Sequence, residues 1–415
     1  MNAHINKQTR CATPPITIYP ASYNYKKFFF TILFSLYLAL SLIGFLIIPN
    51  RVINLIPLFL GLFAFIVLSI RIRRGYVTIY IFVGLLVTSL LISSLIVGRS
   101  FRSIHIPIFF ILSSFGIAQI LLRGFVYSWG GYIVFYGLAV YFLMLMLSGV
   151  DLLLTRGSTN AVSIAILSAC ISLYIILSRE GKKIDLKPAI FALAISIWGI
   201  GRSGIISSIV LLLGFIFIKT RSKRTYLLSM IIILIIAYKY QYTLLDKLMD
   251  YSLFRKPIEV NVQRWTRKTA DPRFTYWANY FENLDISRLL FGVNVLEDPW
   301  IEGAENDYNY HNSFINLHIQ TGLMGLVTIV IILFSLFKYY RTNIAFFILA
   351  ASYILRASTD LFIFFSRFDF ILFFFIFHFL NRLSPSSASF SKSSIGRRLD
   401  ISRLTDYQQV KNDIH

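Results

Sequence analysis

The sequence predicts an all-α polytopic membrane protein with about twelve transmembrane helices and one large external loop. Of its 415 residues, 57% are hydrophobic and only 14% are charged, and the mean hydropathy is +0.69. This composition is too apolar for a single soluble core. Apolar runs of about 20 residues, the length that crosses a hydrocarbon layer of about 30 Å, also recur along the chain.

The formal net charge of +21 is mainly a signal of topology. Most lysines and arginines fall in short connections that lie on one side once the apolar runs are laid across a membrane. Short cytoplasmic connections carry an excess of such residues. These connections therefore mark the cytoplasmic side, and no nucleic-acid partner is expected.

The first four predicted spans place the amino-terminal tail, residues 1–27, in the cytoplasm. The first apolar run follows Lys26 and Lys27 and is too long for a cleaved signal peptide, so we expect it to remain as a span. Arg99 and Arg102 fit the charge rule least well, because they fall in an outer connection. The four spans are 28–48, 52–70, 76–97 and 104–122.

Five further spans complete the first membrane region, residues 28–240. The basic connection from Arg179 to Lys187 is predicted to be cytoplasmic. Two short apolar runs then flank Gly201-Arg202-Ser203-Gly204, which predicts a re-entrant or tightly hairpinned pair with Arg202 at the outer tip. The five spans are 132–150, 161–177, 188–200, 205–218 and 226–240.

The long polar segment 241–312 is predicted to be an external loop domain. Its acidic residues slightly outnumber its basic residues, unlike those of the cytoplasmic connections. Three spans follow within residues 313–380, and the serine-rich, basic residues 381–415 are predicted to form a cytoplasmic tail. The three spans are 313–337, 344–355 and 361–380.

His311 is the candidate catalytic residue, because it stands where the external loop ends and an apolar run begins. An imidazole, with an ordinary pKa near 6.5, is the usual general base at neutral pH. The alternative is a structural role at the helix start, where Asn312 or Ser313 would make a reasonable N-cap. His318 lies deeper in the predicted span and is expected to belong to the core.

Arg202 and Arg273 are candidates for binding an anion. A guanidinium grips phosphate oxygens with two parallel hydrogen bonds, and the glycines beside Arg202 allow close approach. Alternatively, Arg202 is a turn residue whose side chain reaches the membrane interface. Arg273 could instead form an ordinary salt bridge with Asp271.

Arg367 and Asp369 fall inside the last predicted span, where an ionised side chain is costly unless it is paired. Residues two apart on a helix do not face each other, so each is expected to pair with another span. We favour a structural role for them, with a part in the site as the alternative.

The sequence has no pattern that indicates a metal or a cofactor. It contains no Walker A loop, no metal-type Cys/His spacing, no Gly-x-Ser-x-Gly motif and no series of intramembrane carboxylates typical of proton-driven pumps. The first outer connection, Pro49-Asn50-Arg51, has no acidic residue, although metal-dependent membrane glycosyltransferases typically use one there. Metal-free chemistry is therefore expected.

Three motifs resemble those of the O-antigen polymerase and O-antigen ligase superfamily of bacterial inner-membrane proteins. The stretch 311–314, His-Asn-Ser-Phe, with Gly322 and Gly325 after it, is similar to the family signature that follows the large periplasmic loop. Gly-Arg-Ser-Gly at 201–204 is similar to the family's Ser-Arg-Gly motif, with Gly in place of the usual Ser or Thr. Arg273 precedes a Leu-Phe-Gly stretch, as the family's loop arginine does, although Asn294 replaces the second glycine.

The resemblance implies a glycosyltransferase of the GT-C type that moves a glycan from undecaprenyl diphosphate onto a sugar hydroxyl at the periplasmic face, without metal or other cofactor. In this interpretation His311 is the base, Arg202 and Arg273 bind the diphosphate, and Asn312, Arg367 and Asp369 are possible further site residues. Both chain ends would be cytoplasmic, and a chain-length regulator protein is a possible partner.

Three functions stay open on the sequence. The first is an O-antigen or capsular polysaccharide polymerase that joins lipid-linked repeat units, which the His-Asn-Ser-Phe context and the aromatic richness favour. The second is a ligase that passes the glycan to lipid A core. The third is a transporter or flippase, which would more often show paired interrupted helices in two related halves.

Overall fold

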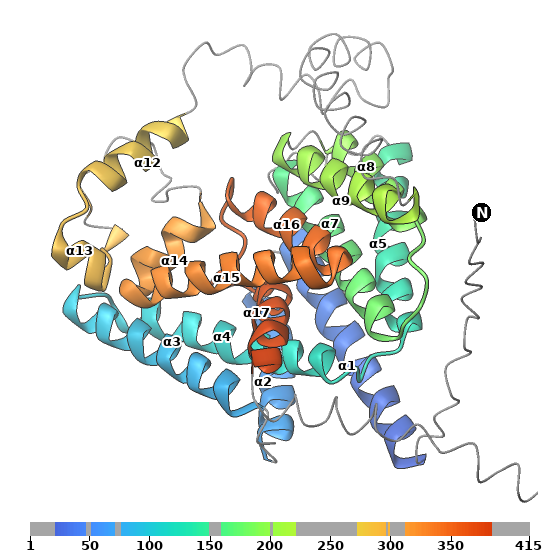
Figure 1. Ribbon diagram of the computed structural model, residues 1–415, viewed down its shortest axis with the longest axis horizontal. Helices are drawn as coiled ribbons and strands as arrows, with labels where there is room; N and C mark the ends of the chain where they lie inside the picture. Colours follow the sequence, from blue (N-terminus) through green and yellow to red (C-terminus); the bar gives the residue numbers. More distant parts are fainter. Residues whose placement is uncertain are drawn as a thin grey trace, which may run out of the picture.

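The computed structural model describes residues 21–46, 51–70, 76–148, 159–199, 202–220, 272–295, 298 and 312–383. Every regular element in these ranges is a helix (Figure 1). The helices are α1 (Ala21–Leu46), α2 (Arg51–Ser69), α3 (Val77–Ile96), α4 (Phe101–Leu122), α5 (Ser128–Ser148), α7 (Thr159–Arg179), α8 (Lys187–Trp198), α9 (Arg202–Thr220), α12 (Pro272–Glu282), α13 (Ile286–Phe291), α14 (Ser313–Thr321), α15 (Leu323–Thr342), α16 (Ile344–Ala357) and α17 (Asp369–Leu383).

The helices confirm a polytopic membrane protein. Within the described ranges, seven helices are long and apolar enough to cross a membrane, and four more are apolar but shorter. The predicted ninth span, 226–240, lies outside the described residues, so the count of twelve stays a prediction. The seven candidate spans lie in α1, α3, α4, α5, α7, α9 and α15, and the shorter apolar helices in α2, α8, α16 and α17.

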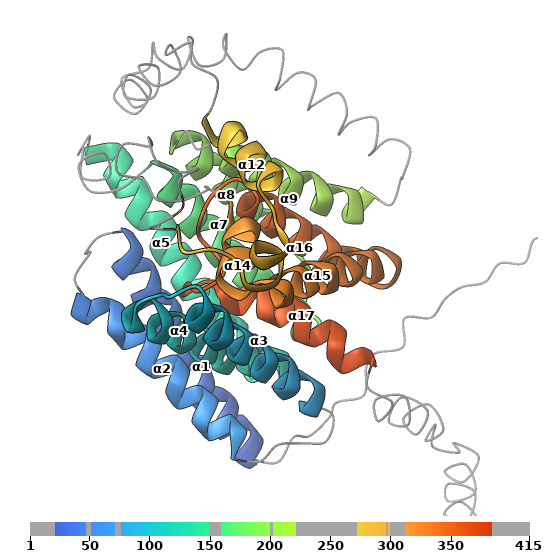
Figure 2. The ribbon, with the colours of Figure 1, turned by 90° about the vertical axis from the view of Figure 1, so that its left-hand side faces the viewer.

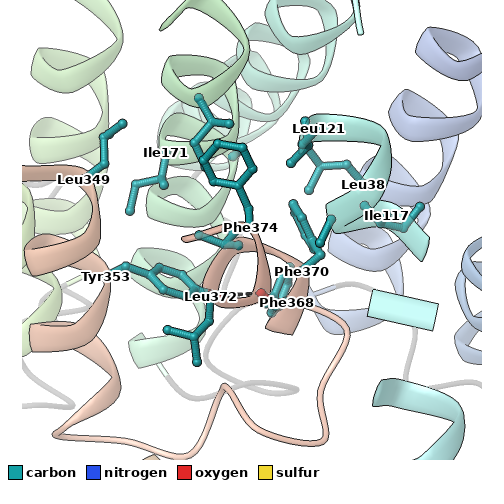
Figure 3. Close-up of a cluster of buried hydrophobic side chains, with 14 of the residues drawn as sticks. Leu38, Ile117, Leu121, Ile171, Leu349, Tyr353, Phe368, Phe370, Leu372 and Phe374 are labelled. Carbon is teal, nitrogen blue, oxygen red and sulfur yellow. Dashed lines mark hydrogen bonds between the residues drawn. The ribbon is translucent and has the colours of Figure 1, made fainter. Parts of the chain in front are cut away.

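The core is built around α7, whose candidate span is 89% buried. Ile171 of α7 points into a cluster with Leu349 of α16 and Phe374 of α17 (Figure 3). Six of the 15 residues of α17 are phenylalanine, and the first half of that helix is almost wholly buried. The side-chain contacts of α7 and α17 therefore hold the bundle together, while α3 and α15 present many apolar side chains outward, as a lipid-facing helix does.

One end of the bundle carries a charged cluster that joins α1, α5 and the turn after α7. Glu180 pairs with Lys27 at 2.8 Å and with Lys182 at 3.0 Å, and it accepts the backbone N–H of Ser128 at 3.1 Å. Burial opposes ionisation of Glu180, but these partners outweigh it and lower its pKa. The residues of this cluster fall in segments that the charge pattern predicts to be cytoplasmic.

The predicted hairpin around Arg202 is confirmed as two packed helices. Ser196 of α8 and Ser208 of α9 lie on either side of the turn, and their hydroxyls are 3.0 Å apart. The interruption is shorter than predicted, because Arg202 is already the first residue of α9. The first residue of the predicted span 205–218 therefore lies inside α9.

Two other predicted helices were wrong in their limits. The predicted span 313–337 is divided at Gly322, whose φ of 54° ends α14 and starts α15. The predicted span 361–380 begins only at Asp369, because residues 361–368 are irregular. Phe364 and Phe365 have φ values of 59° and 68° there, a left-handed conformation that no side chain of this size favours locally.

Candidate functional site

The three principal candidate residues fall at the starts of helices. Arg202 is the first residue of α9, Arg273 is the second residue of α12, and His311 directly precedes Asn312, the N-cap of α14. The N-terminus of a helix favours anions, since its backbone N–H groups are unpaired and its dipole end is positive. The side chains of Arg202 and Arg273 and the whole of His311 lie outside the described part of the chain.

The start of α14 is fixed by hydrogen bonds from two neighbouring residues. The Asn312 side chain accepts the N–H groups of Phe314 at 2.9 Å and Ile315 at 3.2 Å, so the predicted N-cap is confirmed. The Ser313 hydroxyl donates to the Asp360 carbonyl at 2.6 Å. It accepts the backbone N–H groups of Phe362 and Ile363. The residues next to His311 therefore rest on the connection between α16 and α17.

Arg356, which the sequence analysis did not select, lies beside this contact. Its side chain is fully buried at the end of α16, pairs with Asp360 at 3.2 Å and stands 5.5 Å from the centre of the Phe362 ring. The signal in the sequence was an Arg and an Asp four residues apart at the end of an apolar run. Both residues fall in the connection between the predicted spans 344–355 and 361–380.

The contacts of α7, α9 and α16 place Arg202 at the same end of the bundle as Asn312. Three pairs of neighbouring residues give the direction of these helices, namely Gly204 with Ser163, Ser168 with Tyr353, and Gly214 with Ile348. By this alignment α7 and α9 begin at one end, and α16 runs in the opposite direction and finishes there. Since the residues after α16 hold Ser313, the start of α14 is also at that end.

Arg99 joins three segments of the chain around the C-terminal end of α14. It lies between α3 and α4 and donates to the carbonyls of Val293 at 2.8 Å, Gln320 at 2.9 Å and Ile319. Burial lowers the pKa of Arg99 to about 10, so the side chain stays charged at neutral pH. A cation at the C-terminus of α14 complements the helix dipole. This structural role explains why Arg99 fits the charge rule poorly.

A small apolar pocket lies between α12 on one side and α14 and α15 on the other. It encloses about 160 Å³ and is lined mostly by aromatic and aliphatic side chains, with Asn312 at its polar edge. Trp277 and Phe281 contribute from α12, and Leu326 and Ile329 from α15, which is a candidate membrane span. The pocket therefore connects the start of α14 with an apolar helix.

Arg367 lies on the irregular segment and Asp369 is the first residue of α17, whereas both were predicted to lie inside the last span. Arg367 donates to the Ser41 carbonyl of α1 at 3.1 Å, so its predicted pairing with another span is confirmed. Asp369 instead accepts the backbone N–H of Ser366 at 3.0 Å and its hydroxyl at 3.2 Å, so the same prediction was wrong for Asp369. Their part in the site stays a prediction.

The described part of the chain defines a class, a multi-pass membrane protein whose regular elements there are all helices. Within this class, residues 188–330 match the family described as O-Antigen ligase, which confirms the resemblance to the O-antigen polymerase and ligase superfamily for this part of the chain. The matched range contains Arg202, Arg273 and His311. A comparison with curated proteins gives no match.

Proposed function

We propose that this protein is an O-antigen or capsular polysaccharide polymerase of the GT-C type. It joins undecaprenyl-diphosphate-linked repeat units at the periplasmic face of the inner membrane, with both chain ends in the cytoplasm. The observation that carries the proposal is the position of the three candidates, all within the O-antigen ligase match and all at helix starts. The third possibility, a flippase, has no such observation in its favour.

Arg202 and Arg273 neutralise the leaving group in this proposal. When the bond between the anomeric carbon and the diphosphate oxygen breaks, negative charge develops on the diphosphate. Two guanidinium groups supply the positive charge that a metal ion supplies elsewhere, and the N-termini of α9 and α12 add unpaired N–H groups. The reaction then needs no metal.

His311 activates the acceptor. A sugar hydroxyl is a weak nucleophile at neutral pH, and a base within about 3 Å that takes its proton contributes roughly 10² to 10⁴ in rate. The proton passes from the hydroxyl to the imidazole while the hydroxyl oxygen bonds to the anomeric carbon and the lipid diphosphate departs. Asn312 holds the start of α14 next to this residue, which suits a positioning role.

The apolar pocket suits part of the lipid chain of the substrate. Its lining is almost entirely apolar, and it reaches from α15 to Asn312. A prenyl chain that enters along α15 would bring its diphosphate towards the start of α14. Arg367 and Asp369 would act by holding the segment on which Ser313 rests, and a chain-length regulator is a possible protein partner.

The alternative function is a ligase that passes the glycan to lipid A core, and the description of the matched family favours it. The two are separated by deleting the gene in its host and resolving the lipopolysaccharide on a gel. A polymerase deletion should leave core bearing a single repeat unit, because a separate ligase still acts. Bare core alone would identify a ligase, and an unchanged ladder would exclude both a ligase and an O-antigen polymerase.

A further inference from the structure

His318 makes a paired contact that the proposed reaction does not use. It is buried in α14, where Nε2 lies 3.0 Å from the Leu289 carbonyl and Nδ1 is hydrogen-bonded to the Tyr280 hydroxyl of α12. A carbonyl can only accept, so Nε2 carries the proton and Nδ1 accepts from Tyr280. Neutral His318 therefore links α12 to α13 and α14 through hydrogen bonds on both ring nitrogens.

The contact lies where α12 packs on α14. Tyr280 is the buried α12 member of a small cluster, separate from the main core, that contains Ile315 and Ile319 of α14 and Val293. The apolar pocket adjoins this cluster, and Tyr280 and His318 both line it. Figures 1 and 2 show α12 at the edge of the bundle, on the outer side of α14.

We propose that Tyr280 and His318 are positioning residues that hold α12 against α14 and so set the place of Arg273, in the first turn of α12, relative to the start of α14. The importance of the position of Arg273 rests on the proposed function. The docking of α12 against α14 is independent of that function. Protonation of His318 would place a positive charge in this buried contact, and Nδ1, which accepts from Tyr280 in the neutral ring, would have to become a donor to the same hydroxyl.

Docking of α12 should therefore weaken in acid. Burial lowers the pKa of His318 below 6.5, so the state in which α12 has moved away binds more protons, and this state gains population as pH falls below about 6.5. The charged and titratable groups near the contact are Tyr280 itself, Arg99, Arg288 and Asp298. Burial raises the pKa of Tyr280, which keeps its hydroxyl protonated.

The test is thiol labelling of the purified full chain in detergent, with Cys11 and Cys170 replaced. Ile315→Cys places a thiol beneath α12, where the native side chain is 5% exposed. Ile286→Cys, at a position 76% exposed, corrects for the pH dependence of the labelling reaction. Ile332→Cys, at a core position 2% exposed, reports opening of the whole bundle.

Two substitutions distinguish the effect of losing the hydrogen bond from the effect of protonating His318. Tyr280→Phe keeps the ring but removes the hydroxyl, and it should raise the corrected Ile315→Cys labelling about two- to tenfold at neutral pH, as expected for the loss of one neutral hydrogen bond. His318→Gln can still accept from Tyr280 and donate to Leu289 but cannot titrate. With the native His318, the corrected labelling should rise as the pH falls from 7.5 to 5. In the His318→Gln variant it should stay constant over the same range.

The proposal is overturned if Tyr280→Phe leaves labelling unchanged, if acid has no effect with His318 present, or if Ile332→Cys is labelled in parallel. None of these measurements needs activity. A protein that is not a glycosyltransferase could therefore still show the docking of α12, and an active one could lack it.

Discussion

Gly292 lies against the backbone near the end of α14, and Gly322 lies against the backbone at the end of α13. A Cβ atom on Gly292 would stand 1.9 Å from the Ile319 carbonyl oxygen, and one on Gly322 would stand 2.0 Å from the Leu290 oxygen. Both glycines have positive φ, 74° and 54°. The Leu-Phe-Gly stretch and the glycine after the His-Asn-Ser-Phe stretch, which are far apart in the sequence, therefore form one contact at the end of α14.

Alanine at either glycine should destabilise the protein by about 3 kcal/mol or more, because a backbone clash adds to an unfavourable φ. Thermal unfolding in detergent measures the effect. Gly84→Ala is the matched control, since Gly84 lies in helix α3 with open space around its Cβ position, and alanine there should be neutral or stabilise by about 0.5–1 kcal/mol. Equal melting temperatures for all three variants would contradict the contact.

Lysine should not be able to replace Arg99 in stabilising the C-terminal end of α14. Its two terminal nitrogens reach three carbonyl oxygens, an arrangement that a point-like ammonium cannot reproduce. Arg99→Lys and Arg99→Gln should each lower stability by about 1–3 kcal/mol, since buried carbonyls lose their donors. Arg341→Lys, an exposed arginine in the last turn of α15, is the control and should change little. A wild-type melting curve for Arg99→Lys would contradict the prediction.

Membrane spans and the N-cap were predictable because their signals are local. The apolar run at 52–70 predicts α2 to within one residue at each end, and Asn312 caps α14 as its residue type suggests. The segment 361–368 could not be predicted, because it is as apolar as a helix and its irregular form depends on distant partners such as Tyr37, whose hydroxyl donates to the Arg367 carbonyl at 2.6 Å.

The site was predictable only in part, for a similar reason. Residue type and spacing indicated His311, Arg202 and Arg273 as candidates. Nothing local indicates that Arg356 and Asp360 lie beside Ser313. His318 was expected in the core of a span. It is buried, but α14 is a separate helix because Gly322 ends it, so its partners come from α12 and α13.

The proposed orientation predicts the outcome of reporter fusions. A reporter that is active only in the periplasm should be active when fused near Glu282 and inactive near Lys183 or Lys223. The physical reason is the excess of Lys and Arg in the short connections on the opposite side from residues 241–312. Activity at Lys223 would invert the hairpin of α8 and α9 and place Arg202 on the wrong side of the membrane.

Arg202→Lys and Arg273→Lys should be nearly as damaging to polymer formation as the corresponding alanine variants. An ammonium keeps the charge but loses the two parallel hydrogen bonds to a diphosphate. The loss of one charge-assisted bond, about 1.5–3 kcal/mol, corresponds to roughly 10- to 150-fold in rate. The length distribution of the polymer, read from gels at matched protein levels, measures this, with Arg341→Lys as the control. Normal polymer from both lysine variants would leave only structural roles for these arginines.

The most direct test of the proposed chemistry is the polysaccharide made by a deletion strain that carries His311→Gln. Glutamine fills the space and forms hydrogen bonds but cannot take a proton. If His311 is the base, this variant should accumulate in the membrane at the wild-type level and still give the same gel pattern as the deletion. A full ladder from His311→Gln would contradict the account, because a helix cap or packing residue, worth about 1 kcal/mol of stability, tolerates that change.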